Sequence, residues 1–149
     1  MSETAEPVKI ERILVAVDGS EYSSKAVKYA CALGNQFDVE IILLYVVSML
    51  VSATPYNDTV SDQPFLALQR VGEDILSHAK DLADSLSCKV TDLITYGDPA
   101  TRIIEVAEEK QVDMIIMGSR GISGIKRLFV GSVSDKVVNQ ASCPVLLVR

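Results

Sequence analysis

Residues 118–132 read Gly-Ser-Arg-Gly-Ile-Ser-Gly-Ile-Lys-Arg-Leu-Phe-Val-Gly-Ser, and the rest of the chain is organised around this stretch. It holds four of the eight glycines of the chain and follows an apolar run at residues 112–117. Glycine adopts positive φ angles readily and lets the backbone approach a ligand closely. The stretch therefore predicts a buried strand that ends in a flexible loop at a ligand site.

The same stretch is positively charged. Arg120, Lys126 and Arg127 lie in it with no acidic residue among them, although the whole chain has 14 basic and 20 acidic side chains. A positive segment in an acidic background is typical of an anion site, and glycine-rich backbone can add N–H donors to the same anion. From the residues alone, the prediction is a phosphate site.

Length, composition and charge limit the remaining possibilities. A chain of 149 residues fits one domain, and 48% hydrophobic residues favour a soluble globular protein whose strands are buried on both faces. The net charge of −6 argues against a general binder of nucleic acid or of anionic membranes. Cys31, Cys88 and Cys143 are widely spaced, which favours buried thiols in a reducing cytoplasm over a disulfide framework or a zinc site.

Apolar runs and turn residues alternate along the chain. They predict a disordered tail over residues 1–9 and one domain over residues 10–149, with strands at 13–17, 39–47, 89–96, 112–117 and 145–148. We expect helices to begin at Ser20, near residue 68, at Asp98 and at Ser132, where Asp135 has capping-box spacing. Gly34 and Asn35 are expected to end the first helix, and residues 48–65 to form a long loop.

The second helix has an expected buried face. Apolar residues recur along it at helical spacing, and His78, the single histidine of the chain, falls off that face. The expected face comprises Leu68, Val71, Ile75, Ala79, Leu82 and Leu86.

Strands that alternate with helices call for a mostly parallel sheet with helices on both faces. In such a sheet a ligand binds beyond the carboxyl ends of the strands, where the strand order reverses. That position selects Asp18 after the first strand, Val46 in the second, and the glycine stretch after the fourth. The dinucleotide fingerprint and the P-loop pattern are both absent, so the site needs a different phosphate cradle.

The spacing of the glycines is similar to a known nucleotide-binding pattern. Gly118-x-x-Gly121, nine residues and then Gly131-Ser132 resembles the pattern of the universal stress protein family, in which this spacing marks the members that bind ATP. The resemblance extends from Ile13 to Val148 and includes Val-Asp-Gly-Ser at 17–20, Gly-Asp-Pro at 97–99 and Cys-Pro-Val at 143–145. We therefore expect a flavodoxin-like α/β three-layer sandwich, similar to the adenine nucleotide hydrolases, with five strands in the order 3-2-1-4-5.

The resemblance also implies a ligand and its contacts. ATP, with Mg²⁺ as its companion ion, would lie between the first and fourth strands, with Asp18 near the ribose, the phosphates and the metal. Gly131 and Ser132 would offer free N–H groups at a helix N-terminus, and Gly118 and Gly121 would let the backbone turn under the ligand. The implied binding residues are Ala16, Val17, Asp18, Val46, Met117, Gly118, Ser119, Arg120, Gly121, Gly124, Gly131, Ser132 and Val133.

Three functional hypotheses follow. The first, a nucleotide-responsive protein of the stress response, would be cytoplasmic and would form a homodimer through the last strand, at Val145, Leu146, Leu147 and Val148. The second is a slow ATPase, since no catalytic constellation supports rapid turnover. The third is a phosphoacceptor receiver domain, which fits poorly because Asp18 stands alone where an acid pair is needed and the chain ends where a lysine is needed. Acetyl-phosphate labelling of Asp98 would revive it.

Overall fold

The computed structural model describes residues 3–48, 63–121 and 131–149. Within these ranges, strands and helices alternate as the sequence predicts. In chain order, the elements are β1 (Arg12–Ala16), α1 (Glu21–Phe37), β2 (Glu40–Ser48), α2 (Gln63–Ser85), β3 (Val90–Gly97), α3 (Pro99–Glu109), β4 (Met114–Gly118), α4 (Ser132–Gln140) and β5 (Val145–Val148). Most of the expected 48–65 loop lies outside the described residues, and so do Gly124, Lys126 and Arg127.

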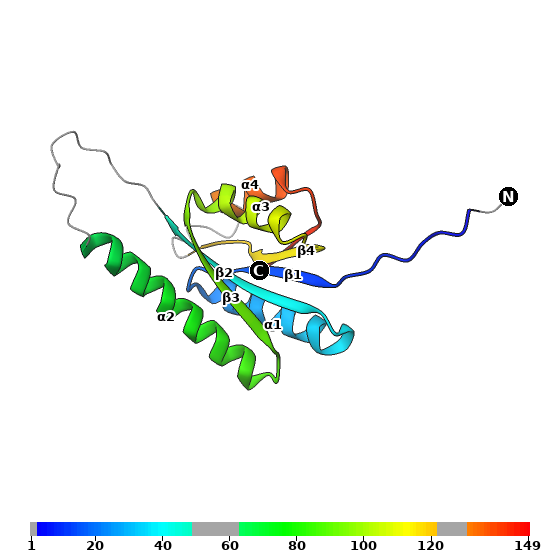
Figure 1. Ribbon diagram of the computed structural model, residues 1–149, viewed down its shortest axis with the longest axis horizontal. Helices are drawn as coiled ribbons and strands as arrows, with labels where there is room; N and C mark the ends of the chain where they lie inside the picture. The colour runs from blue at the N-terminus through cyan, green and yellow to red at the C-terminus, as the bar shows by residue number, and fades with distance from the viewer. Residues whose placement is uncertain (1–2, 49–62, 122–130) are drawn as a thin grey trace.

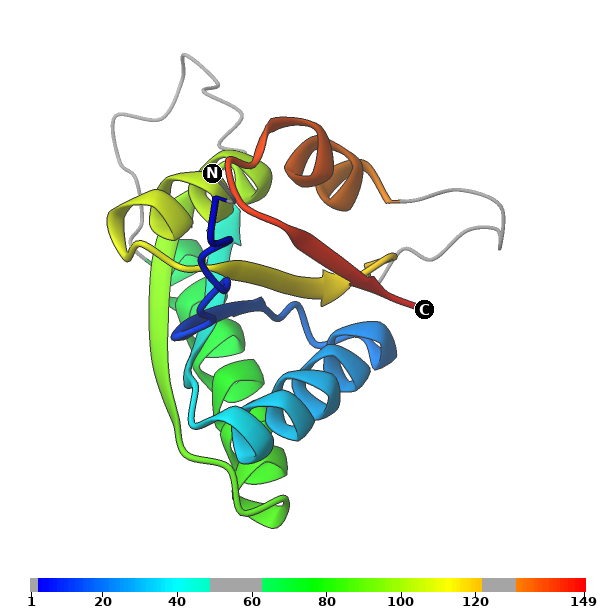
Figure 2. The same ribbon diagram turned by 90° about the vertical axis from the view of Figure 1, so that its right-hand side faces the viewer.

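The five strands form one parallel sheet in the order β3-β2-β1-β4-β5, which confirms the predicted topology. In Figure 1, α1 and α2 cover one face of the sheet and α3 and α4 cover the other. Figure 2 shows β5 at one edge, beside β4. The strand order reverses between β1 and β4, so the carboxyl ends of β1, β2 and β4 meet at the expected ligand-binding edge.

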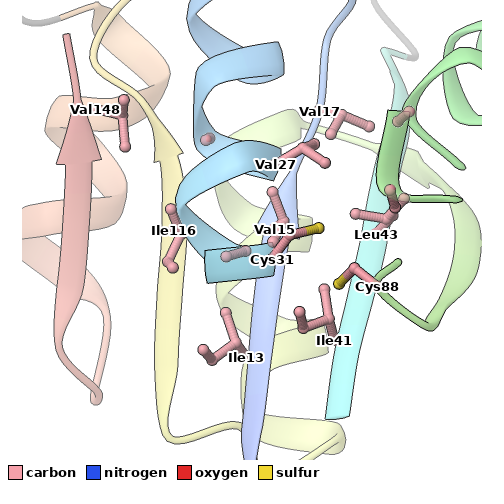
Figure 3. Close-up of a cluster of buried hydrophobic side chains, with 14 of the residues drawn as sticks. Ile13, Val15, Val17, Val27, Cys31, Ile41, Leu43, Cys88, Ile116 and Val148 are labelled. Carbon is pink, nitrogen blue, oxygen red and sulfur yellow. The ribbon is translucent and has the colours of Figure 1, made fainter. Parts of the chain in front are cut away.

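Two hydrophobic clusters hold these layers together. Residues that alternate along β1 point to opposite faces, so Ile13 and Val15 pack toward α1 and α2 while Leu14 packs toward α3 and α4. Figure 3 shows the first cluster, in which Cys31 and Cys88 lie among buried aliphatic side chains. Both cysteines are free thiols, as expected from their spacing.

The first helix begins as predicted and ends later than predicted. Ser20 is its N-cap, and the Ser20 hydroxyl accepts a hydrogen bond of 3.1 Å from the backbone N–H of Ser23. The predicted end at Gly34 and Asn35 is wrong, because α1 continues to Phe37 and Asp38 takes the left-handed conformation at φ 52°. Gly34 has a packing role instead: a Cβ there would lie 2.6 Å from Ile41 Cδ1.

The predicted buried face of α2 is wrong at both ends. Leu68 and Val71 are 48% and 51% exposed, and Leu86 lies beyond the end of the helix and is 36% exposed. In the middle the prediction holds, since Ala79 is buried and Ile75 and Leu82 are half-buried. Gly72, Leu76 and Ala83 are also buried, although they were not predicted. A Cβ on Gly72 would lie 2.5 Å from Tyr45 Cδ1, so the missing side chain lets α2 approach β2 closely.

The start of α2 is also earlier than predicted, because the helix begins at Gln63, inside the expected 48–65 loop. The other boundaries follow the sequence closely. Asp98 caps α3 and Pro99 stands in its first turn, as predicted. Residues 3–11 carry no helix or strand and run away from the domain in Figure 1, while the disorder expected for residues 1–9 stays a prediction. In the parts of the chain that the structure describes, no helix combines the length and the apolar character needed to cross a membrane.

Candidate functional site

A pocket of about 290 Å³ opens at the carboxyl ends of β1, β2 and β4. The structure brings together there eleven of the thirteen residues selected from the sequence: Ala16, Val17, Asp18, Val46, Met117, Gly118, Arg120, Gly121, Gly131, Ser132 and Val133. Ser119 does not line the pocket, and Gly124 lies outside the described residues. Segments more than 100 residues apart in sequence thus meet in one cavity.

Seven further residues line the pocket that were not predicted from the sequence. These are Ser23, Leu44, Tyr45, Ser48, Pro99, Ile103 and Ser134. Strand periodicity could have indicated two of them, because Leu44 and Ser48 are each two residues from Val46 and therefore share its face of the sheet. Pro99 and Ile103 are one helical turn apart on α3, and this helix forms one side of the pocket. No feature of the sequence indicated that α3 contributes to a site.

Asp18 is held by the turn that follows β1. Its Oδ1 accepts a hydrogen bond of 2.9 Å from the backbone N–H of Ser20, and Gly19 between them takes a positive φ of 85°. On the other side, a Cβ on Gly121 would lie 2.9 Å from Asp18 Oδ2. Because Gly121 has no side chain, the Asp18 carboxylate can lie beside its backbone. Oδ1 accepts the hydrogen bond from Ser20, and Oδ2 lies next to Gly121.

Hydrogen bonds at Ser119 join the end of β4 to β5 and to the start of α4. The N–H of Ser119 donates to the carbonyl of Val148 at 2.8 Å, and its carbonyl accepts from the N–H of Gly131 at 2.8 Å and from Ser134 Oγ at 3.0 Å. Ser119 is therefore a buried structural residue that joins β4, β5 and α4. We call these bonds the Ser119 staple.

The staple corrects two expectations about α4. The N–H of Gly131 is not free, because it donates to Ser119. The capping box of Ser132 and Asp135 is wrong as well, since Gly131 occupies the N-cap position and Ser132 is the first helical residue. Ser132 and Val133 remain in the first turn, where backbone N–H groups have no intrahelical acceptor, and both line the pocket.

Gly118 has a different role from the one expected of it. A Cβ on Gly118 would lie 2.6 Å from Tyr22 Cβ and 2.9 Å from the backbone carbonyl carbon of Tyr22. Gly118 therefore allows the N-terminus of α1 to pack on the end of β4. The Tyr22 ring lies near two cations, with Arg120 Cζ at 6.0 Å and Lys25 Nζ at 5.7 Å from the ring centroid.

Tyr45 borders the pocket, but its side chain packs on the opposite face of the sheet from Val46, beside Gly72 of α2. Burial raises the pKa of its phenol, and the negative charge of Asp18 raises it further. Tyr45 thus keeps its proton at neutral pH and remains a hydrogen-bond donor.

An ion pair ties α3 to α4, two walls of the pocket. Asp98 Oδ2 accepts from Thr101 Oγ1 at 2.7 Å, from Thr101 N at 3.0 Å and from Lys136 Nζ at 3.2 Å. The hydrogen bonds from Thr101, followed by that from Lys136, lower the pKa of Asp98 to about 2. Asp98 does not line the pocket, so its position does not favour the receiver-domain hypothesis.

Metal ligands and catalytic groups are sparse. Over residues 3–48, 63–121 and 131–149, no group of three or more His, Cys, Asp or Glu side chains could hold a metal ion. Asp18 is the one acid among the described lining residues. His78 is exposed on α2, where its Nδ1 lies 2.8 Å from the carbonyl oxygen of Asp74. The site suits binding of a phosphorylated ligand better than rapid acid–base chemistry.

Comparisons with known proteins agree with this architecture. The chain is 36% identical over 145 residues to the universal stress protein YxiE of Bacillus subtilis, covering 93% of this chain and 98% of YxiE. It matches the solved structure of MJ0577 from Methanocaldococcus jannaschii with a TM-score of 0.81 and 30% identity, covering 95% and 96% of the two chains.

A third likeness shows the fold alone. The universal stress protein from Archaeoglobus fulgidus, solved in complex with dAMP, matches with a TM-score of 0.69 and 17% identity, covering 96% of this chain and all of that one. The model of the universal stress protein family matches residues 9–149. On this match and the identity to YxiE, the chain belongs to the universal stress protein family.

Proposed function

We propose that this protein binds ATP in the pocket between β1 and β4 and acts as a nucleotide-responsive regulator. The observation that carries the proposal is the meeting of Asp18, Gly121 and the first turn of α4 at the point where the strand order reverses. A relative of the same fold holds dAMP. The volume of about 290 Å³ is near the lower end for ligand pockets and suits the nucleoside part of the ligand.

Each part of the nucleotide has a matching part of the pocket. Adenine would lie against Val46 on β2, and the ribose hydroxyls would donate to Asp18. The phosphates would lie at Gly121, Arg120 and the first turn of α4, where the helix dipole stabilises a negative charge by about 0.3–2 kcal/mol. A Mg²⁺ ion would be held by the ATP phosphates together with Asp18 Oδ2, since Oδ1 is engaged by Ser20.

The structure favours binding over hydrolysis. Among the described lining residues, no second acid or histidine accompanies Asp18 to activate a water molecule. We expect any phosphate release by the purified protein to be far slower than the roughly 1–1,000 s⁻¹ of typical enzymes. Turnover in that range would favour the alternative of a true ATPase.

We further propose a cytoplasmic homodimer that forms through β5. This strand is an edge of the sheet, and Leu146 is 36% exposed on it. Open edge strands readily pair with another chain. Sedimentation is expected to give a particle of about twice the 16.2 kDa chain mass, and a monomer at all workable concentrations would contradict the dimer.

The test of ATP binding combines nucleotide release with calorimetry. The purified protein is denatured, the supernatant is searched for adenine nucleotide, and the stripped and refolded protein is titrated with ATP. Recovery of no adenine nucleotide, together with no heat of ATP binding, would refute the proposal.

A variant pair locates the site. Gly131→Val adds bulk at the N-cap of α4, where the φ of −60° suits any residue and the nearest neighbour of an added Cβ is Ser134 Oγ at 3.4 Å. We expect this variant to fold and to lose ATP binding. Asn139→Ala, at the far end of the same helix, is the control and should bind ATP normally. Unchanged affinity of Gly131→Val would place the ligand elsewhere.

A further inference from the structure

We infer that Tyr22 is a positioning residue that holds the Arg120 guanidinium at the pocket, so that the site distinguishes nucleotides by their number of phosphates. The inference rests on the proposed ATP function and assigns a role to a residue that does not itself line the pocket. It starts from the packing of α1 on β4.

Tyr22 is fixed against the end of β4. It stands in the first turn of α1, half-buried, and the absence of a side chain at Gly118 lets it pack there, since an added Cβ would lie 2.6 Å from Tyr22 Cβ. Gly118 is the last residue of β4 and precedes Arg120 by two positions. The ring of Tyr22 is therefore anchored close to the backbone from which Arg120 projects.

The backbone before Arg120 is fixed as well. The Ser119 staple holds residue 119 to β5 on one side and to α4 on the other. Freedom at Arg120 is thus mainly rotation of its long side chain. The Tyr22 ring limits that freedom, because Arg120 Cζ lies 6.0 Å from the ring centroid, within the range of a cation–π contact.

The two cations near the ring are not equivalent. Lys25 Nζ lies 3.5 Å from Glu21 Oε1 in an exposed ion pair, which partly neutralises its charge. Arg120 forms no ion pair with another described residue and lines the pocket. Tyr22 thus orients the cation that is available to a ligand.

The charge balance of the pocket explains why phosphate number matters. Asp18 places a carboxylate in the pocket, and without Mg²⁺ each added phosphate adds negative charge that the carboxylate repels. An oriented Arg120 offsets this repulsion, and the offset grows with the charge of the ligand. Loss of the Tyr22 ring should therefore weaken ATP binding more than AMP binding.

The experiment compares ATP and AMP affinities by calorimetry in Mg²⁺-free buffer for the wild type, Tyr22→Leu and Tyr22→Phe, with thermal melting as the test of folding. We expect Tyr22→Leu to lose about fivefold in ATP affinity, the scale of one exposed cation–π contact, and less than about twofold in AMP affinity. Tyr22→Phe keeps the ring and should match the wild type. Tyr22→Met, which also lacks the ring, replaces Tyr22→Leu if the latter does not fold.

A double variant separates positioning from a general structural effect. If Tyr22 acts through Arg120, adding Tyr22→Leu to Arg120→Gln should cause no further loss of ATP affinity. Equal losses for ATP and AMP, or additive losses in the double variant, would overturn the inference while leaving ATP binding intact. A wild-type protein that binds neither nucleotide would instead refute the proposed function, and the role of Tyr22 with it.

Discussion

Gly118→Ala is expected to destabilise the whole domain, although it adds only one methyl group. The new Cβ would lie 2.6 Å from Tyr22 Cβ and 2.9 Å from a Tyr22 backbone atom, whereas ordinary contact begins at 3.4 Å. Two backbones would have to separate by several tenths of an ångström, because no flexible side chain lies there to move aside. Overpacking of this kind costs about 1–3 kcal/mol.

Urea unfolding followed by circular dichroism measures this loss. For a slope of roughly 1–3 kcal/mol per molar urea, a loss of about 2 kcal/mol lowers the midpoint by roughly 1 M. Gly131→Ser is the matched control, because its Cβ would meet nothing closer than 3.4 Å and serine is a good N-cap. We expect the control to unfold at or above the wild-type midpoint.

A Gly118→Ala midpoint equal to that of the wild type would contradict this expectation. It would mean that the distance between α1 and β4 leaves room for a methyl group at residue 118. A lower midpoint in both variants would instead point to a general need for glycine at the two positions, which the φ angle of Gly131 does not support.

Three further predictions concern titration, thiols and the staple. The pKa of Asp98 is about 2 in the folded protein and near 3.8 in the unfolded chain, so the free energy of unfolding should fall as the pH drops from 4 to 2. Acid unfolding curves should show a less steep fall for Asp98→Asn than for the wild type. Burial and the neighbouring Cys88 raise the pKa of Cys31 to about 12, so the free energy of unfolding should fall as the pH rises above 9. Because Cys31 and Cys88 are buried, a maleimide should label their thiols only when the protein unfolds, as mass spectrometry would show. Ser134→Ala removes a buried hydrogen bond to Ser119 and should cost about 0.5–1.5 kcal/mol in urea unfolding. The same change at Ser77, which is exposed on α2, is the control and should leave the midpoint unchanged.

The topology could be predicted because strand and helix signals alternate along the whole chain. Ser20 and Asp98 cap α1 and α3 as predicted, since a cap depends on residues a few positions apart. The end of α1 could not be predicted in this way. Gly34 is a stop signal in local terms, but it packs under Ile41 of the next strand, and that contact exists only in the folded sheet.

The same distinction applies to the site. The family resemblance implied most of the described lining residues, and the switch-point rule agrees with it, because the carboxyl ends of parallel strands must share one edge. The roles of individual glycines did not follow from spacing. Gly118 contacts α1 and Gly121 accommodates the carboxylate of Asp18 from the turn after β1, and both contacts join residues about 100 positions apart.

The Ser119 staple has a consequence for how this family can vary. Because the N–H of Gly131 donates to the carbonyl of Ser119, the end of β4 and the start of α4 are held together directly. The entropic cost of closing a flexible loop grows only logarithmically, by about 0.6 kcal/mol for each doubling in length. A change in the number of residues between Ser119 and Gly131 should therefore cost the domain little stability, so that chain length can vary here almost independently of the sheet and α4.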